Sequence, residues 1–172
     1  MNYYVLFVMG GSEEKVRNFL NAKCSSWNVI FPMIERIHKK AGIEKVCLKP
    51  MFPSYLFVRT EMDSKEFKEE LFHLKGQLSG IIRELEYDHD SIPALLDDEI
   101  HFLERILDDQ YCLTISKGYI EEDVLHVTSG ALVGLESYIS HVNRHKKMAT
   151  LTGIRRERIV HVKVALEIVD KS

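Results

Sequence analysis

The spacing of apolar residues changes near Asp108, and this change most constrains what the chain can fold into. Before it, apolar residues recur at helical spacing in three segments, over about 13–24, 62–74 and 96–107. From about Lys117 onward this spacing is absent, and short β-branched segments alternate with turn residues. A chain of 172 residues with this pattern predicts two regions, the first mixed and the second built of strands.

The first region also carries strand patterns between its helical segments. The predicted strands are 3–8, 27–30, 34–38, 44–48, 55–58 and 80–85. Gly42 lies between the third and the fourth of them, which indicates a hairpin. Helices mixed with several strands in this way predict an α+β domain, in which about three helices cover an antiparallel-rich sheet. We expect this domain to span residues 1–108.

The second region is expected to be a small all-β barrel at 118–172, after a linker at 109–117. Its strand candidates are 124–130, 136–143, 148–153, 158–164 and 166–169. Strands packed so densely along the chain are typical of a small barrel, which closes on itself and leaves little free edge.

The composition argues against several classes of protein. Cys24, Cys47 and Cys112 form no CxxC pair, which favours a reducing cytosol over a disulfide framework or a zinc ribbon. The histidines do not pair with cysteines at ligand spacing, so we expect no metal and no cofactor. The P-loop, GxSxG and HExxH motifs are missing, so we do not expect an enzyme. No apolar run approaches the roughly 18 residues of a membrane helix, so no membrane contact is expected.

The segment KPMFPSYLFVRT, residues 49–60, is unusual because two prolines stand directly before an aromatic strand. Proline cannot donate to a sheet and is rare within central strands. Side chains alternate along a strand, so Tyr55 and Phe57 share one face while Leu56 and Val58 share the other. One pair can fill the core while the other faces outward. The alternative is that all of these side chains are core residues.

Several motifs together resemble the NusG family of transcription factors. They are YYVLFV near the N-terminus, the following Gly-Ser helix start, PMFPSYLFV, SIPALLDDEI, and HVTSGALVGLESYISHVN in the tail. The resemblance covers essentially the whole chain: the first region resembles the NusG N-terminal domain, and the tail resembles a KOW domain. The FPSYLFV segment and the short hairpin resemble the specialised LoaP-like and RfaH-like branch more than the housekeeping factors.

This resemblance implies a non-catalytic factor that binds RNA polymerase. In the family, the N-terminal domain docks an apolar depression on the clamp helices of the largest polymerase subunit and suppresses pausing and termination. The positions that match this depression are Phe7, Phe52, Tyr55 and Phe57. The LoaP-like resemblance further implies contact with a hairpin in the nascent RNA. We expect a monomer in the bacterial cytoplasm, associated with the nucleoid through RNA polymerase.

Basic residues gather in the tail, although the net charge of the whole chain is −3. The segment RHKKMATLTGIRRER, residues 144–158, holds two basic clusters on either side of a predicted strand at 148–152. Such a patch neutralises phosphate, the first requirement for RNA binding. The candidate RNA-binding residues are Arg144, His145, Lys146, Lys147, Arg155, Arg156 and Arg158. The alternative is an ordinary solvated turn.

Two departures from the family pattern limit what the resemblance implies. RfaH-like factors read non-template DNA with basic residues after the first strand, where this chain has Met9 and Gly10. The Gly-Pro-aromatic turn of the KOW domain is replaced by Gly130, Ala131 and Leu132, so contacts with Rho or a ribosomal protein are less expected. Two other interpretations stay open: a housekeeping NusG factor without specific RNA recognition, and a ribosome-associated KOW protein.

Overall fold

The computed structural model describes residues 1–86, 95, 97–155 and 158–169, and the side chains of 153–155 and 158–160 lie outside the description. Contacts divide the chain into two compact units. The N-terminal unit comprises residues 1–32 and 50–101, and the C-terminal unit comprises 33–49 and 102–172. Within the described ranges, no helix is long and apolar enough to cross a membrane.

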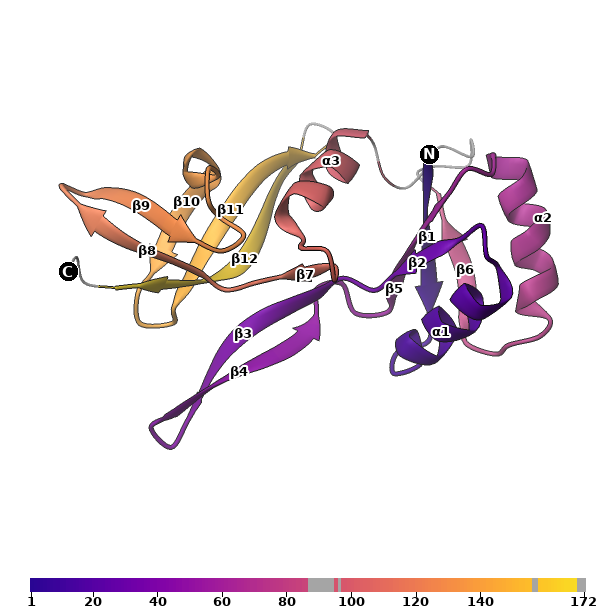
Figure 1. Cartoon of the computed structure of the whole chain (residues 1–172), viewed down its shortest axis with the longest axis horizontal. Helices are drawn as coiled ribbons and strands as arrows, with labels where there is room; N and C mark the ends of the chain where they lie inside the picture. The colour runs from indigo at the N-terminus through magenta and orange to yellow at the C-terminus, as the bar shows by residue number, and fades with distance from the viewer. Residues whose placement is uncertain (87–94, 96, 156–157, 170–172) are drawn as a thin grey trace. The chain divides into compact units, whose positions relative to one another are not determined.

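The N-terminal unit is built on a four-stranded sheet in the order β2-β5-β1-β6 (Figure 1). The strands are β1 (Asn2–Val8), β2 (Asn28–Ile30), β5 (Tyr55–Thr60) and β6 (Ile81–Leu85). Each neighbouring pair is antiparallel, which confirms the expected kind of sheet. β1 and β5 are the central strands, so their side chains meet neighbours on both sides.

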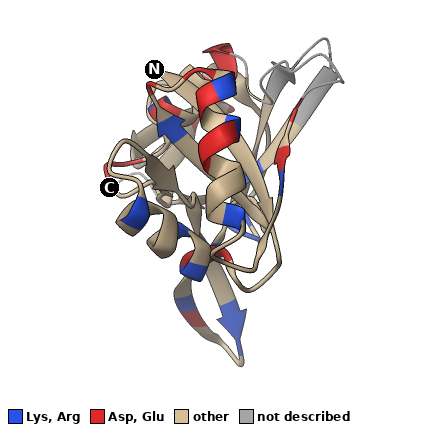
Figure 2. Cartoon of the chain, turned by 90° about the vertical axis from the view of Figure 1, so that its right-hand side faces the viewer, with Lys and Arg blue, Asp and Glu red and all other residues tan. Residues whose placement is uncertain are grey.

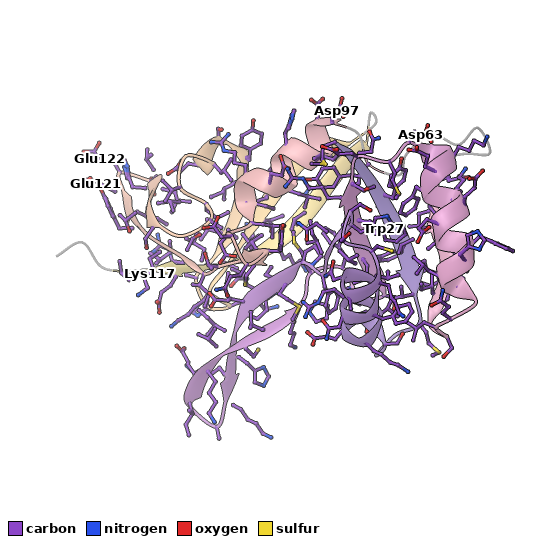
Figure 3. All side chains as sticks on the ribbon, turned by 45° about the vertical axis from the view of Figure 1, so that its right-hand side comes forward. Trp27, Asp63, Asp97, Lys117, Glu121 and Glu122 are labelled. Atoms are coloured by element: carbon purple, nitrogen blue, oxygen red, sulfur yellow. The ribbon has the colours of Figure 1, made fainter. Side chains whose placement is uncertain are left out.

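Two helices, α1 (Glu13–Lys23) and α2 (Ser64–Lys75), contribute the apolar core on one face of this sheet. Phe67 of α2 is fully buried, and its ring stacks on Tyr4 at 3.9 Å and lies 4.8 Å from Trp27. Figure 3 shows Trp27 within this unit and Asp63 at the start of α2. Asp63 accepts from the backbone of Lys65 and Glu66 in a capping box, which fixes where the helix begins.

Five strands of the C-terminal unit form one sheet in the order β10-β11-β12-β8-β9. They are β8 (Ser116–Glu121), β9 (Val124–Ser129), β10 (Ile139–Asn143), β11 (Met148–Arg155) and β12 (Arg158–Ile168), and the short helix η1 (Glu136–Tyr138) precedes β10. The expected all-β fold of the tail is confirmed. The observed strands differ in part from the predicted ones. The last two candidates form the single strand β12, and β8 was not among the candidates.

A second, smaller sheet of this unit has the order β4-β3-β7. β3 (Met33–Lys40) and β4 (Ile43–Pro50) form the predicted hairpin, and β7 (Cys112–Leu113) pairs parallel to the base of β3. The stretch expected as a linker therefore contains β7 and the start of β8. The third α-helix, α3 (Asp97–Ile106), completes the three α-helices of the described residues, and its Arg105 Nη2 donates to the Gly134 carbonyl at 2.9 Å.

Candidate functional site

The four aromatic residues singled out by the sequence gather on one face of the N-terminal sheet. Phe7 of β1 lies directly opposite Tyr55 of β5, and their ring centroids are 5.4 Å apart. Phe57 is two residues further along β5, and its ring lies 5.5 Å from that of Phe52. We call Phe7, Phe52, Tyr55 and Phe57 the aromatic patch. Leu56 and Val58 are fully buried, but Phe57 is buried as well, so Tyr55 alone of the pair expected to face outward is partly exposed.

Burial differs among the members of the aromatic patch. Phe57 is only 6% exposed, because it sits in the middle of the sheet between β1 and β2 and lies next to Phe52. Phe7, Phe52 and Tyr55 are half-buried and present part of their rings at the surface. Phe57 thus forms the floor of the patch, and the other three residues are partly exposed.

The turn before β5 sets the position of Phe52 and Tyr55. Ser54 adopts the left-handed conformation with φ of 70°, and its carbonyl accepts from the backbone of Val8 at 2.8 Å. The backbone amide of Ser54 donates to the Glu13 carboxylate at 3.1 Å. Pro53 is exposed and precedes the strand, so its lack of an N–H costs no bond of the sheet. Pro53 therefore lies in a tightly held corner before β5, whereas Pro50 is the last residue of β4.

Glu13 lies in the first turn of α1. It is 8% exposed, and its bond to Ser54 ties the start of that helix to the corner. We expect Glu13→Ala to lower the free energy of unfolding by about 1–3 kcal/mol, because a backbone amide loses a charged acceptor. Urea unfolding measures this, with Glu13→Gln as the control, since an amide oxygen still accepts. Equal stability of Glu13→Ala and the parent chain would contradict the role.

The first basic cluster forms the turn between β10 and β11. Arg144, His145 and Lys146 are exposed, and the backbone amide of Lys146 donates to the Asn143 side chain at 2.9 Å. We call residues 144–147 the basic turn. Its last residue, Lys147, is in the left-handed conformation with φ of 47°. The turn therefore presents three basic side chains to solvent from a defined backbone.

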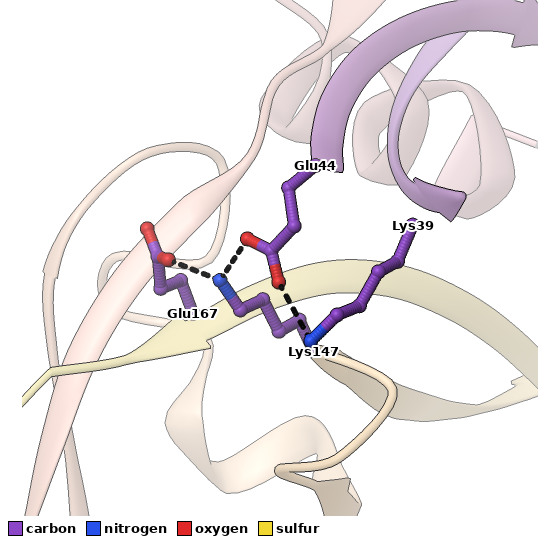
Figure 4. Close-up of polar contacts among 4 residues, drawn as sticks. All are labelled: Lys39, Glu44, Lys147 and Glu167. Atoms are coloured by element: carbon purple, nitrogen blue, oxygen red, sulfur yellow. Dashed lines mark hydrogen bonds and ion pairs between the residues drawn. The ribbon is translucent and has the colours of Figure 1, made fainter. Parts of the chain in front are cut away.

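Lys147 differs from the rest of the basic turn because its charge is used within the C-terminal unit (Figure 4). Its Nζ lies 2.5 Å from the Glu44 carboxylate of β4 and 2.7 Å from the Glu167 carboxylate of β12. Hydrogen bonds to Glu167 and Glu44 raise the pKa of Lys147, and the bond to Lys147 lowers the pKa of Glu44. Glu44 is 103 residues away in sequence, so no local pattern could have indicated this pairing.

The second basic cluster is not brought next to the first. The backbones of Arg155 and Arg158 pair at the far end of β11 and β12, whereas the basic turn precedes the first residue of β11. A strand of this length separates its ends by about 23 Å. Arg156 lies outside the described residues, and so do the side chains of Arg155 and Arg158.

Comparison with known proteins gives consistent results over residues 1–104. The family model "Transcription termination factor nusG" matches residues 1–104. The transcription termination/antitermination protein NusG of Thermus thermophilus is 22% identical over 167 residues, which cover 89% of this chain and 91% of the relative. A solved structure, described as domain interaction in Thermotoga maritima NusG, aligns over 96% of this chain and 92% of its own with 14% identity. Its TM-score is 0.40.

Proposed function

This chain belongs to the NusG family of transcription factors, and we propose that it binds RNA polymerase through the aromatic patch and suppresses pausing and termination. NusG-family factors are not enzymes, so the chain is not one, in agreement with the missing catalytic motifs. The proposed contact on the polymerase is the pair of clamp helices of the largest subunit.

The observation that carries this proposal is the aromatic patch itself. Three half-buried rings surround the buried floor residue Phe57 on the sheet face opposite the core of α1 and α2. Partly exposed aromatic side chains held rigidly in this way are the usual anchors of a protein interface. An amphipathic helix can lay its apolar side into such a surface, so a helical partner fits the chemistry.

We further propose that the chain is a LoaP-like antitermination factor in which a KOW domain at 118–172 contacts a hairpin of the nascent RNA. The contact would use Arg144, His145 and Lys146 of the basic turn, with Lys147 holding the turn in place. Arg155, Arg156 and Arg158 would supply a second contact at the other end of β11. In this proposal the chain acts as a monomer in the bacterial cytoplasm, where RNA polymerase associates it with the nucleoid.

The RNA contact predicts a measurable change in salt dependence. Replacing Arg144 and Lys146 together by Gln should weaken binding of a labelled RNA hairpin and reduce its salt slope by roughly 1.5, since each lost phosphate contact removes about 0.7–0.9. Fluorescence anisotropy over a range of salt concentrations measures both quantities. The matched control is the double substitution Lys65→Gln and Lys75→Gln, on exposed positions of α2. An unchanged slope in the Arg144 and Lys146 variant would make the turn an ordinary solvated surface.

The two other interpretations predict different partners. The tagged full-length chain is incubated with purified RNA polymerase and, separately, with purified ribosomes, and retained material is identified by its subunits. We expect polymerase to be retained. Retention of ribosomes alone would favour a ribosome-associated KOW protein and contradict the proposal. Retention of polymerase without any RNA binding would favour a housekeeping NusG factor.

A further inference from the structure

Beyond its base, the β3–β4 hairpin is a two-stranded ribbon whose backbone pairs with no further described strand. Among the described strands, β3 pairs with β7 only through Met33 and Ile34 at its base. From Glu35 onward, β3 pairs only with β4, and its other backbone edge has no partner strand among the described residues. At about 3.3 Å per residue this ribbon extends for roughly 20 Å. Lysine and arginine occur on both of its strands in Figure 2, where it forms the lowest part of the view.

The turn of the hairpin fixes which side chains share a face. Ala41 and Gly42 both have positive φ, 50° and 80°, as in a two-residue hairpin turn that pairs Lys40 with Ile43. Two contacts agree with this register: Lys39 lies 3.9 Å from Glu44, and Cys47 Sγ lies 3.5 Å from the Arg36 carbonyl. Because side chains alternate, one face carries Arg36, His38, Lys40, Ile43, Lys45, Cys47 and Lys49.

Charge is divided unequally between the two faces, although Lys39 shares a face with Glu44. The face just given has no carboxylate, and we call it the basic face of the hairpin. Both acidic residues of the hairpin, Glu35 and Glu44, are on the opposite face. There they bind other parts of the C-terminal unit: Glu35 accepts from the Ile115 backbone at 2.8 Å, and Glu44 binds Lys147 at 2.5 Å. These two carboxylates are therefore engaged within the unit, while Lys39, Val46 and Leu48 on the same face are exposed.

The exposed side chains of the basic face are available to a partner. His38, Lys40, Lys45 and Lys49 are all exposed, and Ile43 between them is 62% exposed. Lysine on an edge strand such as β4 can also serve to prevent pairing with other chains. Edge protection requires charge along the edge but does not require one sign on one face, so it leaves the unequal division of charge unexplained.

We propose that the basic face of the β3–β4 hairpin binds duplex DNA, a function beyond the polymerase and RNA contacts proposed above. The major groove of B-DNA is about 12 Å wide and admits a two-stranded ribbon. The lysines would contact phosphates along the groove, and exposed Ile43 is positioned for apolar contact with base edges. Duplex RNA fits less well, because its major groove is deep and too narrow for side chains to read.

The test replaces Lys40, Lys45 and Lys49 by Gln in the full chain and measures anisotropy of a labelled DNA duplex across salt concentrations. The variant should bind about tenfold or more weakly at low salt, and its salt slope should fall by roughly 2.7, about 0.9 for each phosphate contact. Circular dichroism checks that the fold is kept, which exposed Lys-to-Gln changes should preserve. Unchanged affinity and slope in the folded variant would overturn the proposal.

Two controls separate this site from the others. Gln substitutions at Lys65, Lys75 and Lys117 remove the same charge outside the hairpin and should leave the slope near that of the parent. The variant with Arg144→Gln and Lys146→Gln should keep its DNA affinity. If that variant lost DNA binding as the hairpin variant does, the basic turn would be the DNA site and the proposal would fail. The same measurement is made with an RNA duplex of the same sequence. If the parent chain bound it as tightly as DNA, and the hairpin variant lost that binding to the same extent, the assignment to DNA would be overturned.

Discussion

Replacing Phe52 and Tyr55 together by Glu is expected to abolish binding to a clamp-helix fragment of RNA polymerase while leaving the chain folded. Both rings are half-buried and lie on the sheet face opposite the helix-covered core. Aromatic anchors of an interface are typically worth at least 2 kcal/mol each, so losing two corresponds to about 4 kcal/mol, or roughly a thousandfold in Kd. The introduced carboxylates add a desolvation cost on top of the lost contacts. Isothermal titration calorimetry with the fragment measures the change.

Phe72 supplies the matched control for that experiment. It lies on α2 and is 76% exposed, so Phe72→Glu makes the same chemical change away from the aromatic patch. We expect fragment affinity to be unchanged in this variant. Fluorescence of Trp27, which is buried in the N-terminal unit, reports whether each variant is folded. Parent-like affinity in a folded Phe52 and Tyr55 variant would remove the aromatic patch from the polymerase contact.

Phe67→Ala should destabilise the N-terminal unit more than any other single change considered. The side chain is completely buried and contacts the rings of Tyr4 and Trp27. Truncating a buried Phe costs about 3–5 kcal/mol through lost transfer free energy and the cavity left behind. The stacking with Tyr4 adds to this, because aromatic pairs contribute about 0.5–1.5 kcal/mol beyond their buried area. Urea unfolding followed by Trp27 fluorescence measures the loss.

The control is again on α2. Phe72→Ala removes the same atoms from an exposed position, so the midpoint of urea unfolding should stay close to that of the parent. A similar small effect from Phe67→Ala would mean that Phe67 is not part of a tightly packed core. That result would contradict the account of how α2 is held against β1.

The features of the fold that depend on local residue patterns were predictable from the sequence. Strand geometry predicts that Tyr55 and Phe57 point away from Leu56 and Val58, but Phe57 is buried all the same, because exposure also depends on what covers each face. The helices at 13–23 and 64–75 follow from apolar spacing, with Asp63 as a local start signal. Such features depend only on neighbouring residues, so one sequence contains enough information to find them.

The features that join distant residues were not predictable. β7 pairs with β3 across nearly half of the chain, and the Glu44–Lys147 contact spans 103 residues. The bond from Ser54 to Glu13 likewise joins two segments whose proximity is set by the sheet. β8 was missed for a different reason: its segment SKGYIE is short, contains Gly118, and lacks a strong β-branched pattern.

The basic residues show how topology changes a candidate site. From sequence, the clusters at 144–147 and 155–158 were expected to flank one short strand. The observed strand, Met148–Arg155, is longer and places their backbones at its opposite ends. Lys147 is also withdrawn from the candidate RNA surface by its two carboxylate partners. The unequal division of charge on the β3–β4 hairpin, by contrast, emerges only once the register of the hairpin is known.

In vitro transcription across an intrinsic terminator tests the central claim most directly. Purified RNA polymerase transcribes a template with its upstream leader in the presence of the full chain, and the fraction of transcripts that read through is measured. The account predicts that the parent chain and the Phe72→Glu variant raise readthrough, whereas the Phe52→Glu and Tyr55→Glu double variant leaves it at the level of polymerase alone. Readthrough that the parent chain does not change, or that the double variant raises equally, would contradict the claim.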